Sequence, residues 1–238
     1  MADEVSFSRV VPSGIAKPVE LLDKGAQASR DEYVLDHGFT RSGIAHEWWT
    51  SREIEIRFPS NVGGKERLTR RDLFELGQKA DSGDEILDFV WHVLAWGSGR
   101  RNRNNLKRIT SCTDQIDLLR EAIEAARAGD ARAAYSTLVR GRAIPYLGPA
   151  FFTKILYFAS GSDDPRCLIL DARVARSLYR LGWSISPTYP SRNFSYRWYT
   201  DTCESYCETL TEWAAERASA SGPLRADVLE RLLFERGR

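Results

Sequence analysis

Apolar residues recur along most of this chain at every third or fourth position, which is the spacing of helices that bury one face. Residues 83–97 show it best, because they carry a broad apolar stripe that ends at Gly97: Ile86, Leu87, Phe89, Val90, Val93 and Leu94. The same spacing, with capping residues or glycine at the ends, predicts further helices over 69–81, 113–130, 131–141, 171–181 and 201–219. We therefore expect a mainly α protein.

Only two short stretches alternate as a strand does. Residues 51–58, SREIEIRF, are the better candidate, and residues 7–11, FSRVV, are a weaker one. No internal repeat or long linker divides the chain. We expect one compact domain over residues 1–238, made of two packed helical subdomains with little or no β-structure: residues 68–182, and residues 1–67 with 183–238.

The chain has no secretion signal and no run of about 18 apolar residues, so a cytoplasmic protein with reduced thiols is expected. Its four cysteines are Cys112, Cys167, Cys203 and Cys207. Cys203 and Cys207 share a helix face, but no second cysteine or histidine pair lies near them in sequence. His37 and His46 are interpreted as structural. We therefore expect no metal and no cofactor.

The net charge of +1 hides an asymmetry. Residues 99–198 hold 17 Lys or Arg and 8 Asp or Glu, so this block carries +9 and the rest carries −8. Such a block is typical of a face that binds a polyanion, although a surface built for solubility could have the same composition. Within residues 96–108, WGSGRRNRNNLKR, five cations occur without an acid.

Residues 144–155, IPYLGPAFFTKI, interrupt an apolar segment with Pro145, Gly148 and Pro149. Pro145 ends the preceding helix, Gly148 permits a tight turn, and Pro149 suits the first position of a new helix. Two helices joined by a glycine hairpin can hold a DNA phosphate at the N-terminus of the second helix. Further along, the run CLIL leads into Asp171, which is placed to start another helix.

Together these two segments resemble the helix-hairpin-helix DNA glycosylases, especially their 8-oxoguanine DNA glycosylase-like branch. That family has a Pro-Gly-hydrophobic-Gly hairpin and, downstream, an aliphatic run with a catalytic aspartate in a Val-Asp-x-x-Val pattern. IPYLGP (144–149) matches the hairpin, with Tyr146 where the first glycine usually stands, and LILDARV (168–174) matches the aspartate segment. The resemblance covers about residues 140–182, with looser agreement in helical layout over 68–215.

The resemblance implies that Asp171 is the catalytic carboxylate. A carboxylate stabilises the positive charge that develops on the deoxyribose as the N-glycosidic bond breaks. Asp171 would also serve as a helix N-cap, and the two roles are compatible. The chain lacks the iron–sulfur cysteines of the endonuclease III branch.

Lys154 is the second catalytic candidate. The family's lysine position falls at Ala150, and Lys154 lies one turn later on the same helix face. An amine among apolar neighbours has a lowered pKa and can form a Schiff base with the sugar. The long side chain could instead reach solvent, in which case water is the nucleophile. Both alternatives stay open.

The remaining site residues fall into two sets. Contacts to DNA are expected from the hairpin, the basic loop and the helix after Asp171, although the loop could simply be solvated: Gly148, Pro149, Ala150, Arg100, Arg101, Arg103, Asn104, Lys107 and Arg173. Aromatic side chains that could line a pocket for an everted base, although tryptophans in helices are more often core, are Trp91, Trp96, Phe151, Tyr196 and Trp198.

We expect a monomeric, helix-hairpin-helix DNA glycosylase that acts on double-stranded DNA at the nucleoid and has no membrane segment. It would flip a modified base and hydrolyse its N-glycosidic bond to leave an abasic site, with or without a lyase step. The base would be an oxidised purine such as 8-oxoguanine, or a hypermodified phage base in a defence role. The alternative is a non-catalytic protein that uses the hairpin to bind DNA structures.

Overall fold

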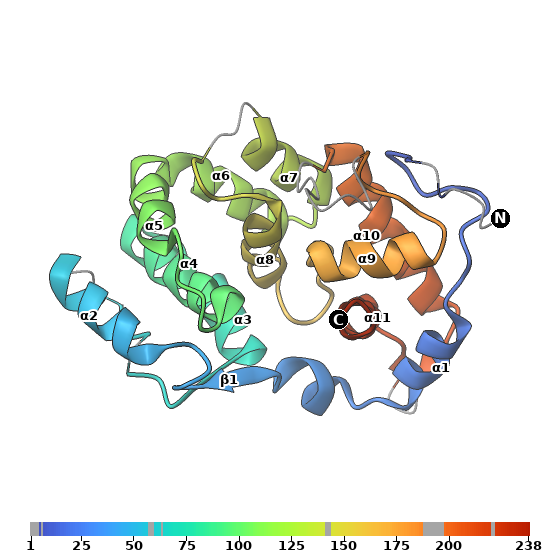
Figure 1. Ribbon diagram of the computed structural model, residues 1–238, viewed down its shortest axis with the longest axis horizontal. Helices are drawn as coiled ribbons and strands as arrows, with labels where there is room; N and C mark the ends of the chain where they lie inside the picture. Colours follow the sequence, from blue (N-terminus) through green and yellow to red (C-terminus); the bar gives the residue numbers. More distant parts are fainter. Residues whose placement is uncertain are drawn as a thin grey trace.

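Figure 1 shows a computed structural model of the chain, which describes residues 5, 7–56, 60–62, 64–140, 144–187, 198–219 and 222–238. The described part is mostly helical, as the hydrophobic spacing predicts. Its sheets are short, two-stranded pairs. No described helix is both long and apolar enough to cross a membrane.

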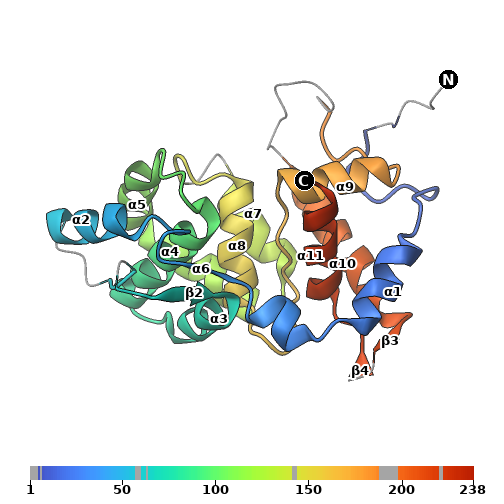
Figure 2. The same ribbon diagram turned by 60° about the horizontal axis from the view of Figure 1, so that its bottom comes forward.

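The elements form two groups with α7 (Ala131–Val139) and α8 (Pro149–Ala159) between them (Figure 2). The first group holds β1 (Gly38–Thr40), α2 (His46–Ile56), β2 (Arg67–Thr69), α3 (Arg70–Lys79), α4 (Gly83–Ser98), α5 (Asn105–Asp114) and α6 (Ile116–Arg127). The second group holds α1 (Val19–Gln27), the π-helical turn η1 (Asp31–Leu35), α9 (Ala172–Arg180), α10 (Thr200–Ala215), β3 (Ala218–Ser219), β4 (Gly222–Pro223) and α11 (Ala226–Arg236).

Local capping explains where several helices begin. Thr69 and Asp72 form a reciprocal capping box at the start of α3, and Ser82 and Glu85 form another at the start of α4. Pro149 occupies the first turn of α8, where its missing amide costs nothing. These starts agree with the boundaries that the sequence predicts.

The helix α3 crosses α8 at very short range. A Cβ at Gly77 would lie 2.4 Å from the carbonyl oxygen of Phe158, so only glycine fits there. The aromatic rings of Phe74 and Phe158 pack edge to face beside the crossing, with centroids 5.2 Å apart. The close crossing fixes α8 against the first group.

The strand predicted over residues 51–58 is wrong. Residues 51–56 continue α2, which begins at His46, five positions before the alternating run, and residues 57 and 58 lie outside the described part of the chain. The indole of Trp49 is fully buried and meets Trp91 of α4 with ring centroids 5.4 Å apart. Alternation alone is a weak signal, and this tertiary contact outweighs it.

The weaker candidate, residues 7–11, is also not a strand of a sheet. Its described pairing is an isolated bridge between Phe7 and Ser184, next to a bond from Trp183 Nε1 to the carbonyl of Ser8. The ordered sheets lie elsewhere: β1 pairs antiparallel with β2, and β3 with β4. After η1 the chain enters the first group through β1, which pairs with β2.

Two elements are placed differently from the predicted subdomain ranges. The helix α2 packs on α4 through Trp49 and Trp91, although its residues were assigned to the flanking subdomain. The helix α9 packs on α11, where the Ser177 hydroxyl donates to the carbonyl of Leu233 at 2.6 Å. The junction between α8 and α9 is therefore also a junction between the two groups.

Candidate active site

The hairpin before α8 turns at Tyr146. This residue has φ 64°, in the left-handed region that favours glycine, and the Leu147 amide donates to the carbonyl of Ile144 at 3.2 Å. Gly148, by contrast, is extended at φ −81° and acts as the N-cap of α8. The expected freedom of Gly148 is therefore not what makes the turn. Gly148 has no side chain with which to cap α8, so within the described residues the N-terminal end of this helix is left to an outside acceptor.

Asp171 is fixed at the start of α9. Its Oδ1 accepts hydrogen bonds from the backbone amides of Arg173 and Val174 at 2.9 and 3.1 Å, as an N-cap does. The preceding chain is held by Tyr206, whose hydroxyl donates to the carbonyl of Ile169 at 2.9 Å. The second oxygen, Oδ2, faces α8.

Lys154 meets Asp171 across the junction of α8 and α9. Its Nζ lies 3.8 Å from Asp171 Oδ2, and the two side chains are only 9% and 14% exposed. The same nitrogen donates to the carbonyl of Ala150 at 2.5 Å, so the side chain points back toward the start of its helix. The structure thus brings together the two residues that the sequence suggested for catalysis.

The surroundings of Lys154 lower the pKa of its amine. Burial lowers its pKa, while Asp171 and Glu230 oppose that shift and Arg70 adds to it. Gly97 of α4 leaves room for the side chain, because a Cβ there would lie 3.1 Å from Lys154 Cδ. An amine and a carboxylate that are partly buried together can transfer a proton and attack an electrophilic carbon.

A buried polar network lies behind this pair. Arg70 of α3 donates to Glu230 of α11 at 2.9 Å and to the Tyr157 hydroxyl at 3.1 Å. Tyr157, one turn after Lys154 on α8, donates to Asp227 at 3.2 Å, and Arg30 pairs with the same carboxylate at 2.9 Å. Burial opposes the charged form of Arg70, but Glu230 and Tyr157 outweigh it and raise its pKa. The network joins α3, α8 and α11.

A protein-family model described as "Putative 8-oxoguanine DNA glycosylase OGG-like protein" matches residues 32–234 of the chain. The chain belongs to this family. The resemblance to 8-oxoguanine DNA glycosylase-like enzymes is thereby confirmed, and the helical fold agrees with it. The chain matched none of the curated proteins and none of the solved structures with which it was compared.

In this OGG-like protein the predicted basic loop is shorter than expected, because residues 96–98 end α4 and residues 105–108 begin α5, where Lys107 and Arg108 meet the hairpin. The side chains of Arg100, Arg101, Arg103 and Lys107 are exposed, and Asn104 starts α5 with φ 66°. Arg108, which was not among the predicted DNA contacts, donates from Nε to the carbonyl of Tyr146 at 3.0 Å. Its guanidinium also lies 3.9 Å from the ring centroid of Phe151. The loop and hairpin therefore form one cationic surface.

The predicted base-pocket residues do not lie together. Trp91 is fully buried against Trp49, so it is a core residue and offers no surface for a base. Trp198 is 2% exposed and lines a pocket of about 760 Å³ with Phe152. Because Phe152 stands two residues before Lys154, this pocket lies on the opposite face of α8. Tyr196 falls outside the described residues.

Phe151 and Trp96 do lie near Lys154. Lys154 Nζ is 5.9 Å from the ring centroid of Phe151, which is half-buried. Trp96 precedes Gly97 and is 6% exposed, in an aromatic cluster with Phe158. Two of the predicted aromatic residues therefore remain candidates for the wall of a base pocket.

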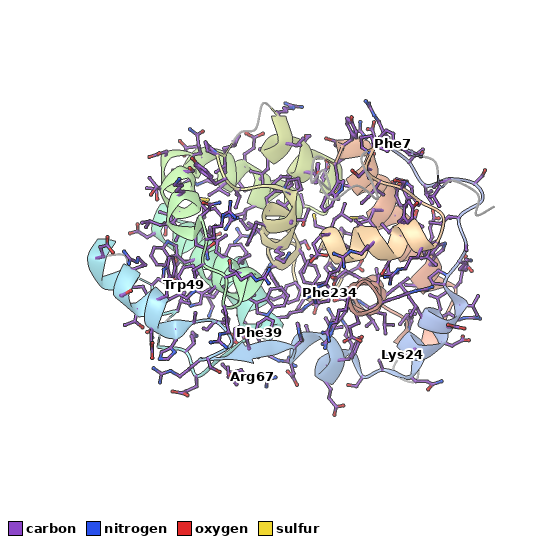
Figure 3. The ribbon with its side chains drawn as sticks, viewed as in Figure 1. Phe7, Lys24, Phe39, Trp49, Arg67 and Phe234 are labelled. Atoms are coloured by element: carbon purple, nitrogen blue, oxygen red, sulfur yellow. The ribbon has the colours of Figure 1, made fainter. Side chains whose placement is uncertain are left out.

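Sequence reasoning missed residues that reach the site from distant segments. His37 and Phe39, at the start of β1, meet Trp96 with ring centroids 5.5 and 5.8 Å away. Burial, with help from Arg70, lowers the pKa of His37 to about 3, so its imidazole is neutral. On the other side, Arg173 lies over Phe234, which Figure 3 labels on α11 close to the start of α9. No local pattern links these positions.

The cysteines do not enter this site. All four thiols are buried and free. Among the residues that the structure describes, no three His, Cys, Asp or Glu side chains gather as metal ligands. Cys203 and Cys207 share a hydrogen bond, and together with burial it raises the pKa of Cys203.

Proposed function

We propose that the protein removes a modified base from duplex DNA by breaking its N-glycosidic bond. The observation that carries the proposal is the partly buried pair of Lys154 Nζ and Asp171 Oδ2, 3.8 Å apart, beside an open helix N-terminus and a cationic surface. Membership of a family described as DNA glycosylases supports the same reaction class.

Asp171 is the catalytic carboxylate in this proposal. When the glycosidic bond breaks, the deoxyribose becomes positively charged, and a carboxylate held nearby stabilises that state. The α9 cap occupies Oδ1 of Asp171, which leaves Oδ2 to face the sugar. The cap thus holds the reactive oxygen in place without consuming it.

Lys154 adds a covalent route to the proposal. Its neutral amine attacks the anomeric carbon, and the base leaves with the electron pair of the broken bond. The nitrogen then loses a proton to Asp171, which passes it to the departing base. The nitrogen lone pair next forms a C=N bond while the C1′–O4′ bond of the sugar ring breaks and O4′ takes up a proton from water. The resulting Schiff base permits strand cleavage, whereas attack by water would release the base alone.

DNA binding is assigned to the start of α8 and the cationic surface. Gly148, Pro149 and Ala150 would hold a phosphate at the helix N-terminus, where the macrodipole favours an anion. The exposed cations of the loop, with Arg173, would follow the backbone on either side. Trp96 and Phe151 would wall the flipped base.

For the substrate we propose an oxidised purine such as 8-oxoguanine, the base named in the family description. A hypermodified base of phage DNA is the second candidate. It is favoured by the two departures from the resembling motif, Tyr146 in the hairpin and Ala150 in place of the lysine.

The test is incubation of the purified protein with duplexes that each carry one candidate base, followed by alkali. We expect strand breaks at one modified base. The logarithm of the association constant should fall linearly with the logarithm of the salt concentration, with a slope of about −0.9 per neutralised phosphate. Borohydride should trap an adduct with the protein, and Lys154→Ala should lose it. Base release without an adduct would still support a DNA glycosylase and would indicate that water is the nucleophile.

Two other outcomes would contradict the proposal. If the protein binds duplexes but leaves every base in a broad panel intact, modified phage DNA included, a non-catalytic DNA-binding protein explains the fold better. Negligible affinity for duplexes at low salt would contradict both functions.

A further inference from the structure

Tyr146 adopts a backbone conformation that its side chain does not favour. Its φ of 64° lies in the left-handed region, where a Cβ is crowded and glycine is the usual residue. Among the described residues it shares a positive φ with two other non-glycine residues, Ala45 and Asn104. Strain of this kind persists where the surroundings impose it and is concentrated at functional sites.

The strained turn is held by the first turn of α5. Arg108 Nε donates to the carbonyl of Tyr146 at 3.0 Å, and its guanidinium stacks on Phe151, 3.9 Å from the ring centroid. Lys107 Nζ lies 5.1 Å from the centroid of the Tyr146 ring. Two cations from one helical segment therefore fix both the backbone and the ring of this tyrosine.

Core packing does not explain the ring. Tyr146 is 53% exposed, which makes it one of the few large apolar side chains of the described residues that face solvent. It stands at the edge of the 760 Å³ pocket, together with Trp198 and Tyr199. This pocket lies on the face of α8 opposite Lys154, so a ligand of Tyr146 would be separate from the reacting sugar.

We propose that Tyr146 stacks on an unpaired base of bound DNA, at a place distinct from the catalytic pair. The proposal rests on the DNA binding proposed above, because the phosphates held by Lys107 and the start of α8 would bring bases within reach of the ring. A base offers a flat π-face that an exposed aromatic ring recognises without regard to sequence. Removal of one base from the stack leaves its partner unpaired, and that partner is the base we assign to Tyr146.

Three variants separate the ring from the strain. Tyr146→Phe keeps both the ring and the strained Cβ, Tyr146→Leu keeps the Cβ but loses the ring, and Tyr146→Gly loses both. Affinity is measured for a fully paired duplex and for the same duplex with one base opposite an abasic site. Wild type and Tyr146→Phe should prefer the second duplex, whereas Tyr146→Leu and Tyr146→Gly should lose about tenfold in affinity for it alone.

Thermal unfolding of the same variants distinguishes a structural role. Because glycine relieves the left-handed strain, Tyr146→Gly should unfold at the same temperature as wild type or higher. A fall of several degrees in the unfolding temperature of Tyr146→Gly would show that the ring stabilises the fold, which would overturn the inference. Equal affinity of Tyr146→Leu and Tyr146→Phe for the second duplex would also overturn it. If the wild type excises a base while Tyr146→Leu still prefers the duplex with one base opposite an abasic site, only this inference fails. If wild type binds no duplex, the proposed function fails with it.

Discussion

The side-chain nitrogen of Lys154 lies 3.8 Å from Oδ2 of Asp171, although Lys154 belongs to α8 and Asp171 caps α9, a helix of the second group. Lys154 stands one turn beyond the position at which the resembling family carries its lysine, which is Ala150 here. The side chain makes up this displacement, because its Nζ reaches back and donates to the carbonyl of Ala150 itself. The nitrogen of the side chain is thus at the level of the expected position.

Replacement of Asp171 by Asn should separate catalysis from folding. Asparagine caps a helix about as well as aspartate, so the free energy of unfolding should change by less than about 1 kcal/mol. Excision should fall at least ~100-fold, because the negative charge that stabilises the sugar cation is lost. Asp130→Asn is the control, since Asp130 caps α7 by accepting from Ala133 N at 2.8 Å. Excision by Asp171→Asn at the wild-type rate would show that the carboxylate only caps α9.

The pH dependence of borohydride trapping should report Lys154. Only the neutral amine attacks, and burial lowers its pKa below the 10.5 of an exposed lysine. The trapping rate should therefore rise with pH and reach half its maximum below 10.5. Glu230 raises this pKa, so Glu230→Gln should move the midpoint to still lower pH, while Glu20→Gln on the exposed face of α1 should not move it. A midpoint shifted upward by Glu230→Gln would refute this electrostatic account.

Gly97→Ala should disturb the amine without unfolding the protein. The new methyl group would lie 3.1 Å from Lys154 Cδ and 3.5 Å from Cε, so the flexible side chain must move. Alanine also favours the helix over glycine by about 1 kcal/mol, which should keep the variant at least as stable as wild type. Gly83→Ala on the same helix is the control, because its methyl group meets only Ile116 Cγ1 at 3.7 Å. Trapping should slow in the first variant alone, and equal trapping in both would place Lys154 outside the reaction.

Loss of one partner in the Arg70–Glu230 ion pair should be costly. Glu230→Leu leaves a buried guanidinium without its carboxylate, and denaturant unfolding should show a loss of about 3–5 kcal/mol. The double variant Arg70→Met/Glu230→Leu should regain most of that loss, since no buried charge remains. The exposed pair of Arg41 and Glu66 provides the comparison, with an expected effect below about 1 kcal/mol. Additive losses in the double variant would show that the two residues are not coupled.

Local sequence signals predicted those parts of the fold that depend on neighbouring residues. The capping box at Thr69, the proline at the start of α8 and the cap at Asp171 each involve groups a few residues apart, and each appears where it was expected. The hydrophobic spacing of residues 83–97 likewise corresponds to α4. Such features can be predicted from short stretches of sequence because the hydrogen bonds and contacts that produce them join residues close in the chain.

Contacts between distant segments could not be predicted in this way. Arg70 and Glu230 are 160 residues apart, and Arg108 and Tyr146 are 38 apart. Neither contact can therefore be recognised from the spacing of residues in the sequence. The helix α2 was mistaken for a strand because its decisive contact, Trp49 with Trp91, comes from another helix. The hairpin turns at a tyrosine where reasoning from propensity placed the turn at Gly148. The distance between Lys154 and Asp171 also required the three-dimensional fold.

A single hydroxyl group connects the residues next to Lys154 and Asp171. Thr153 Oγ1 accepts from the backbone amide of Leu170 at 3.2 Å and donates to the carbonyl of Pro149 at 2.8 Å. Lys154 follows Thr153, and Asp171 follows Leu170, so the main chains that carry the amine and the carboxylate are tied together one residue away. The two groups are therefore preorganised, and the conformational work of reaching them falls on the DNA.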